Sequence, residues 1–187
     1  MNPLTDISEA YKRWRHSRGF GVHSPFAYDL VKCVVSPGNY AYYGYNDIDR
    51  ALLTPGTDVY NHLQHDAYLL LRLLVFLKTK CLIIYPSKQP VMECAAGSAG
   101  VKCGVMTKAS LGNAGYDTLI FATNISFPNE IMKAMNAGAA IMVADSGMKL
   151  KDSIITAMTD GLILEGRRIM IAIPRRDMVL THYSMKF

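Results

Sequence analysis

The sequence lacks an apolar run long enough to cross a membrane as a helix. The longest apolar stretch covers residues 67–77 and is interrupted by Arg72, whereas a spanning helix needs about 20 residues. The first ten residues contain Asp6 and Glu9, and no apolar segment precedes a small-residue cleavage site. We therefore expect a cytoplasmic protein without a membrane partner.

The sequence also lacks the cysteine patterns that are typical of metal sites. Its four cysteines form no C-x-x-C pair and no Cys/His cluster with zinc spacing, and they are Cys33, Cys81, Cys94 and Cys103. Free cysteine is among the most buried residue types. We therefore expect no metal site, and we expect these cysteines to be reduced core residues.

Charged residues are scarce, at 19% of the chain, while hydrophobic residues make up 50%. A chain of 187 residues with this composition can bury a core of its own. We see no internal repeat and no interdomain linker. These features predict a single domain over residues 1–187.

The net charge is +5, and basic residues gather locally near the N-terminus. The basic residues there are Lys12, Arg13, Arg15 and Arg18, and Tyr11, Trp14 and His16 lie between them. Such a segment can contact RNA or another anion, or it can be the solvated face of a helix. No recognised RNA or DNA module accompanies it, so we favour the solvated face, and nucleic acid remains the less favoured partner.

Residues 1–79 predict a series of helices. Asp6 and Glu9 resemble a capping box, and Ser24 followed by Pro25 is typical of a helix start. Apolar residues then recur at helical spacing. We expect helices at residues 25–35, at 47–53, and from 57 or 58 to 78.

Residues 80–187 alternate short β-rich runs with turns and helices, which is typical of a doubly wound, mainly parallel sheet. We expect strands at residues 81–85, 91–94, 101–106, 118–123, 139–144, 168–173 and 179–186. Connecting helices are expected at residues 129–135 and 150–159. The predicted fold class is therefore α/β and Rossmann-like, with N-terminal helices ahead of the sheet.

The last two expected strands are joined only by residues 174–178. This connection is too short for a crossover helix, so we expect residues 168–173 and 179–186 to form a C-terminal antiparallel hairpin. Ile169, Ile171 and Ile173 alternate with Met170 and Ala172. Both faces of this strand are apolar, which predicts an interior position in the sheet. Tyr183 and Met185 should pack on the core from one face of the final strand.

Two segments resemble a known family. Residues 18–26, RGFGVHSPF, resemble the N-terminal signature of a class I S-adenosylmethionine-dependent methyltransferase-like family of bacterial proteins, and residues 181–187, THYSMKF, resemble its final strand. The resemblance implies S-adenosylmethionine as cofactor and methyl transfer as activity. In that family a glycine-rich turn follows the first strand, and an acid after the second strand binds the ribose.

The cofactor motif is degenerate in this chain. Residues 86–90, PSKQP, contain no glycine, and prolines remove N–H donors that a cofactor cradle needs. Residues 91–100 match the motif in part, with Glu93 as its acid and Gly97 as one glycine. In the other placement, Glu93 lies near the end of the second strand as the ribose-binding acid. A strand-end carboxylate in water is the structural alternative for Glu93.

Asp145 ends a strongly apolar strand, at the edge where open α/β folds bind ligands. The resemblance implies a cofactor-binding acid there, and a turn role is the alternative. The candidate cofactor-binding residues are therefore Glu93, Gly97 and Asp145. The catalytic residues and the methyl acceptor are not identified.

The spacing within the sheet predicts a shortened fold. About 30 residues separate the first expected strand from residue 118, whereas two βαβ steps need nearly twice as many. We therefore expect crossover helices to be missing there. Two functional hypotheses follow. The chain is either an S-adenosylmethionine-dependent methyltransferase or a degenerate, non-catalytic relative that acts as a binding or assembly module.

Overall fold

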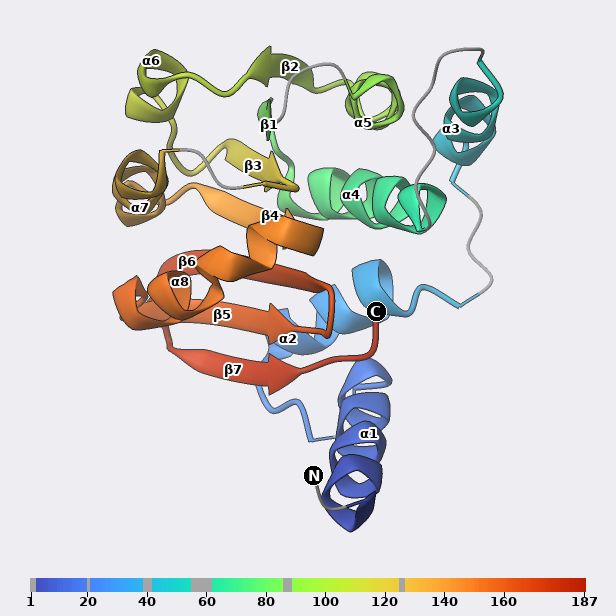
Figure 1. Ribbon diagram of the computed structural model, residues 1–187, viewed down its shortest axis with the longest axis vertical. Coiled ribbons are helices and arrows are strands. Elements are labelled where there is room, and N and C mark those ends of the chain that lie inside the picture. The colour runs from blue at the N-terminus through green and yellow to red at the C-terminus, as the bar shows by residue number, and fades with distance from the viewer. Residues whose placement is uncertain (1–2, 20, 39–41, 55–61, 86–88, 125–126) are drawn as a thin grey trace.

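The computed structural model describes residues 3–19, 21–38, 42–54, 62–85, 89–124 and 127–187 (Figure 1). Helices make up the N-terminal part, as the sequence predicts. They are α1 (Pro3–Ser17), α2 (Pro25–Leu30), the π-helical turn η1 (Val31–Val35), α3 (Gly44–Leu52) and α4 (Leu63–Leu77). Ser24 caps α2 by accepting a hydrogen bond from the backbone N of Ala27, and Pro25 fills the first position. The predicted start of the last helix, at residue 57 or 58, lies outside the described residues.

The C-terminal part is an α/β unit with one seven-stranded sheet. Its strands are β1 (Cys81–Tyr85), β2 (Lys102–Val105), β3 (Thr118–Ala122), β4 (Ala140–Ala144), β5 (Asp160–Glu165), β6 (Ile169–Val179) and β7 (Thr181–Ser184). The strand order is β2-β1-β3-β4-β6-β5-β7. Strands β2, β1, β3 and β4 are parallel, and β6 is antiparallel to both of its neighbours. The Rossmann-like prediction is confirmed.

Helices cover both faces of the sheet. The helices that connect and follow the strands are α5 (Pro90–Ser98), α6 (Lys108–Gly112), α7 (Pro128–Asn136), the 3-10 helix η2 (Asp145–Leu150) and α8 (Lys151–Ala157). One face packs against α2, α4 and α5, with Phe121 in its core, and the other packs against α6, α7 and α8. Over residues 169–173, both faces of β6 are buried, because Ile171 points into the first core and Met170 into the second. The predicted interior position of this strand is confirmed.

The prediction of a strand at residues 91–94 is wrong, because this segment belongs to α5. Pro90 occupies the first turn, where its missing N–H costs little. Val91, Met92, Ala95 and Ala96 then recur at helical spacing and are all buried on one side. The short apolar run therefore follows a helical period rather than alternating as a strand.

The predicted pairing of the C-terminal hairpin is also wrong. An antiparallel hairpin is present, but it joins β5 to β6, while β7 pairs with β5 in parallel. Residues 174–178 are part of β6, whose end reaches the start of β5 at the pair Asp160–Val179. Strand β5 was not predicted because Gly161 resembles a helix C-cap. Its φ of +116° instead belongs to an irregularity in the β5–β6 register.

The crossovers near β1 are shortened rather than missing. Helix α5 has nine residues and α6 has five. The cysteines are also less buried than predicted, since Cys33 and Cys103 are exposed and Cys81 and Cys94 are intermediate. Among the described residues, no helix combines the length and the apolar character that a membrane span requires.

The final strand anchors the sheet, and this anchoring can be tested by mutation. Tyr183 and Met185 are buried, as predicted from the sequence. We expect Tyr183→Ala to lower the free energy of unfolding by about 3 kcal/mol in urea denaturation, because it removes a large core side chain. Val179→Ala is the control, since Val179 is 84% exposed. Equal stability of both variants would contradict the packing of β7.

Candidate functional site

The carboxyl edge of the sheet between β1 and β3 is the point where the winding changes direction. The chain leaves β1 for β2 on one side, and β3 lies on the other side of β1. Ligands of open α/β sheets bind at such a point. Gln89 Nε2 donates a hydrogen bond of 3.4 Å to Thr123 Oγ1 beside it. Of the glycine-free loop at residues 86–90, only Gln89 and Pro90 are described.

Glu93 and Gly97 lie on the exposed side of α5, one turn apart. Glu93 is in the first turn and lies close to β2. Neighbouring atoms partly desolvate the Cys103 thiol and raise its pKa to about 11, and the negative charge of Glu93 contributes to this shift. Gly97 lies near the amino edge of the sheet. It is in the last turn of α5, shortly before β2, and the first residue of β2, Lys102, pairs with the first residue of β1, Cys81. Both residues therefore belong to a helix rather than to a strand end or a glycine turn.

Asp145 lies at the carboxyl end of β4, as the sequence predicts, and begins η2. Its φ of +51° is in the left-handed region, which aspartate tolerates better than most residues. The backbone N of Asp145 donates to the Arg168 carbonyl at 3.0 Å. Its Oδ1 accepts a hydrogen bond of 3.3 Å from Arg168 Nη1. Asp145 and Gly97 thus lie at opposite edges of the sheet, and the three candidate residues do not converge.

Arg168 also binds a second carboxylate, which sequence analysis did not identify. Asp66, in the first turn of α4, is fully buried, and its two oxygens accept hydrogen bonds from Nη1 and Nη2 of Arg168. The Nη1–Oδ2 distance is 2.6 Å. The two residues are 102 positions apart in the chain. Only the fold brings them together, so no local motif could reveal the pair.

The protonation of Asp66 is set by this contact. Burial alone raises the pKa of a carboxyl group, but hydrogen bonds from Arg168 and His65 outweigh burial and hold the pKa of Asp66 below its ordinary value. His65 Nδ1 lies 3.5 Å from Asp66 Oδ1. The pKa of Arg168 is raised, chiefly by its hydrogen bond to Asp66. Asp66 is therefore ionised at neutral pH.

A neighbouring ion-pair cluster surrounds Glu165 at the end of β5. Its Oε1 forms an ion pair with Lys151, and its Oε2 lies 2.8 Å from His182 Nε2. Glu165, Asp66 and Asp145 therefore each face a basic side chain of the protein. These three carboxylates hold β4, β5, β6 and their flanking helices together at this edge.

The carboxyl end of β2 differs from the pattern of the resembled family. Met106, Thr107 and Lys108 follow this strand and supply no carboxylate. Thr107 instead caps α6, because its side chain accepts from the backbone N of Ser110 while the Ser110 hydroxyl accepts from the backbone N of Thr107. The residues directly after β2 therefore form a helix cap and contribute no acid at this strand end.

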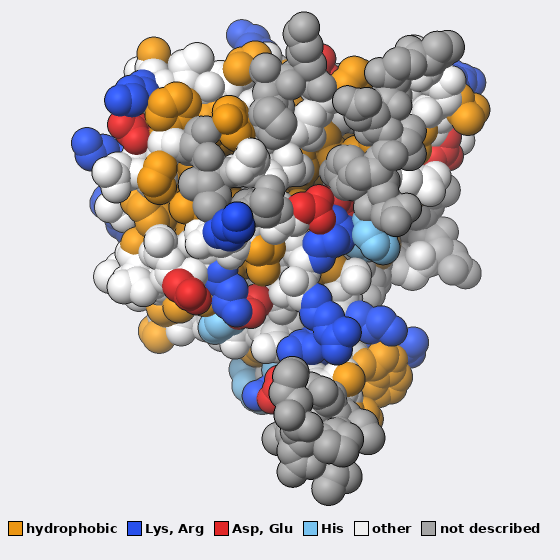
Figure 2. All heavy atoms as spheres, in the orientation of Figure 1, with side chains coloured by type: hydrophobic (Ala, Val, Ile, Leu, Met, Phe, Trp, Pro, Cys, Tyr) orange, Lys and Arg blue, Asp and Glu red, His pale blue; other side chains and the backbone are white. Residues whose placement is uncertain are grey.

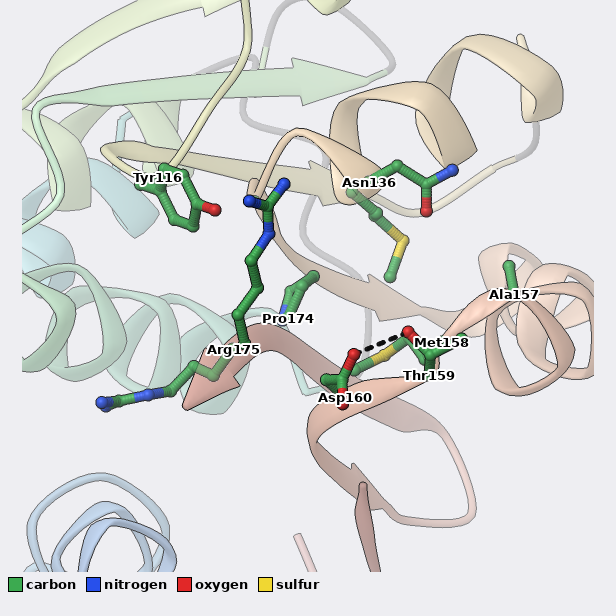
Figure 3. A pocket seen from close by; sticks show the side chains of 11 residues that line it. Tyr116, Asn136, Ala157, Met158, Thr159, Asp160, Pro174 and Arg175 are labelled. Carbon is green, nitrogen blue, oxygen red and sulfur yellow. Dashed lines mark hydrogen bonds between the residues drawn. The ribbon is translucent and has the colours of Figure 1, made fainter. Parts of the chain in front are cut away.

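A cavity of about 220 Å³ lies at the amino edge of the sheet (Figure 3). Tyr116, Asn136 and Asp160 border it, together with Arg175 and Arg176. The Asp160 carboxylate accepts a hydrogen bond of 2.8 Å from the Thr159 hydroxyl. Arg175 is engaged elsewhere, since its guanidinium pairs with Asp177 and lies 4.2 Å from the ring centroid of Phe26. This cavity contains none of the sequence-predicted site residues.

Comparisons of the chain with protein-family models, curated proteins and solved structures found no match. Within the described ranges, no group of three or more His, Cys, Asp or Glu side chains is placed to hold a metal ion. At the carboxyl edge, the ionised side chains that we describe bind one another. Their arrangement is that of an internal clamp, which we call the Arg168 clamp and define as Asp66, Asp145 and Arg168.

The placement of Gly97 gives a test of its role. No atom lies within 4 Å of the position that a Cβ would take, and its φ is outside the left-handed range. We expect Gly97→Ala to raise the free energy of unfolding by about 0.5–1 kcal/mol, because alanine loses less backbone entropy in a helix. Gly161→Ala is the contrasting control, since a Cβ there would lie 2.2 Å from the Ile173 carbonyl. Loss of stability in Gly97→Ala would contradict the helical placement.

The Arg168 clamp makes a prediction for stability and pH. Asp66→Asn should cost about 3 kcal/mol at neutral pH, because it leaves a guanidinium without its buried partner. Asp145→Asn, at an exposed pair, should cost less than about 1 kcal/mol. Since the folded pKa of Asp66 is lowered, its contribution is present above about pH 4 and is lost as the pH falls through the folded value. Urea titrations of both variants and the wild type, from neutral to acid pH, measure these free energies of unfolding. A difference between Asp66→Asn and the wild type that does not change with pH would contradict the prediction.

Proposed function

We propose that this chain is a methyltransferase-like α/β domain that acts as a non-catalytic binding or assembly module. The observation that carries the proposal is the Arg168 clamp. Asp145 is the candidate cofactor residue at the carboxyl end of β4, and its carboxylate and backbone N both bond to Arg168. A ribose would have to compete with an internal guanidinium for this acid.

The segment between β1 and β3 supports the same proposal. Residues 91–100, which resemble the cofactor motif in sequence, form most of α5 and the turn after it. The residues directly after β2 contain no acid. Both features remove groups that the resembled family uses on its cofactor, while the buried face of α5 still completes the core. The need to complete the core therefore accounts for residues 91–100 without any role in cofactor binding.

An S-adenosylmethionine-dependent methyltransferase with an unknown acceptor is the second candidate. The specific observation in its favour is the sheet, because β1 and β3 meet at a switch point of the kind that binds nucleotides. In this alternative, Glu93 in the first turn of α5 is the described acid nearest that point along the chain. Methyl transfer depends mainly on positioning, so it needs no fixed catalytic signature.

Calorimetry separates the two candidates. We expect no binding heat when S-adenosylmethionine is titrated in large excess at two temperatures, and no rise in the melting temperature. Two temperatures are needed because the binding enthalpy can pass through zero at one of them. Asp145→Asn should bind no better and no worse than the wild type. A saturable heat that is weakened by Asp145→Asn or by Glu93→Gln would establish the methyltransferase alternative instead.

A further inference from the structure

The basic N-terminal segment becomes part of a larger surface in the folded chain. Arg13 and Trp14 of α1 line a hollow of about 340 Å³ together with Arg167 and Lys186. Arg167 comes from the β5–β6 turn and Lys186 follows β7. Figure 2 shows Lys and Arg side chains gathered where α1 meets the body of the molecule, next to hydrophobic side chains. We define Arg13, Trp14, Arg18, Arg167 and Lys186 as the α1 patch.

The α1 patch is held in place by the sheet. Ser17, which is buried, donates from Oγ to the Lys186 carbonyl at 3.1 Å and accepts from the Lys186 backbone N at 2.6 Å. His16 Nδ1 lies 3.1 Å from the Ser184 carbonyl oxygen. The His16 ring packs edge-on against the Tyr183 ring, with the ring centroids 5.4 Å apart. The basic residues of α1 and those of the C-terminal part are therefore fixed relative to one another.

The cations of the hollow are not neutralised by described neighbours. Arg13, Arg167 and Lys186 form no ion pair with the acidic side chains that the structure describes. The residues that the structure describes around this hollow include no acid. Glu9, on α1, is exposed to solvent. Three unpaired cations around one concavity indicate a site for a polyanion, whose phosphates gain from counterion release.

Aromatic rings lie beside these cations. Trp14 is 40% exposed and Tyr11 is 59% exposed, and their rings are nearly parallel, with centroids 5.9 Å apart. The Arg18 guanidinium lies 4.8 Å from the Trp14 ring centroid. Proteins that bind single-stranded nucleic acids combine a basic groove with aromatic platforms of this kind, because every base can stack on a ring.

We propose that the α1 patch binds single-stranded nucleic acid, with Arg13, Arg167 and Lys186 on phosphates and Trp14 as a base-stacking platform. An unstacked base is required for stacking on Trp14, which favours single strands over duplexes. The proposal does not depend on the loss of the cofactor, because the α1 patch contains neither Asp66 nor Asp145. A failure to bind nucleic acid would therefore overturn only this proposal, and binding of S-adenosylmethionine would overturn only the proposed function.

Trp14 provides a direct probe, because it is the only tryptophan in the chain. We expect oligouridylate to quench its emission saturably. With three phosphate contacts, the affinity should fall roughly 20-fold between about 50 and 200 mM salt. Trp14→Ala should weaken the binding of labelled oligouridylate about tenfold in fluorescence anisotropy, while Trp14→Phe should retain most of it. Melting curves of both variants establish that they fold.

A charge-matched pair of variants tests the location of the site. The triple variant Arg13→Gln, Arg167→Gln and Lys186→Gln should lose at least tenfold in affinity at low salt and most of its salt dependence. The control Lys80→Gln, Lys102→Gln and Lys133→Gln removes the same charge from exposed positions on other elements, and it should bind nearly as well as the wild type. Equal losses in the two triple variants, no quenching of Trp14, or binding to phosphatidylserine vesicles without binding to oligouridylate would overturn the proposal.

Discussion

The ion pair between Asp66 and Arg168 is the contact on which the arrangement of the chain depends most. It joins the first turn of α4 to the start of β6, across 102 residues of sequence. Burial of an ionised carboxylate is unfavourable unless a cation and hydrogen bonds compensate for it. Arg168 supplies both, and its remaining contacts hold Asp145 at the end of β4. Helix α4 is thereby attached to the ends of β4 and β6, and Asp145 at the end of β4 is one of the candidate cofactor-binding residues.

The same contact supports the proposal that the carboxyl edge has a structural use. In an open α/β sheet, this edge is the usual ligand site. Here Asp145 and Glu165 both face basic side chains of the protein. Cations without an ion pair to a described side chain instead surround the hollow beside α1, and one of them, Arg167, directly precedes the clamp residue Arg168. These two adjacent arginines therefore have different roles. Arg168 binds Asp66 and Asp145 at the carboxyl edge, whereas Arg167 lines the hollow beside α1.

Sequence patterns predicted the parts of this molecule that depend on local periodicity and capping. Strands β1, β3 and β4 and the cap at Ser24 are of this kind. The errors arose where a short segment satisfies two patterns, as at residues 91–94, or where glycine marks a strand irregularity rather than a helix end, as at Gly161. The parallel pairing of β7 with β5 depends on long-range packing. The same is true of the Arg168 clamp and of the position of Lys186 opposite α1, so local sequence carries no signal for them.

The most direct test of this account is a crystal structure of the protein grown with S-adenosylmethionine in large excess. The account predicts that Arg168 remains bonded to both Asp66 and Asp145, and that no cofactor density is present at the carboxyl ends of β1 and β3. Density for the cofactor at this edge, with Asp145 turned from Arg168 toward the ligand, would contradict the structural role of the clamp and favour the methyltransferase alternative.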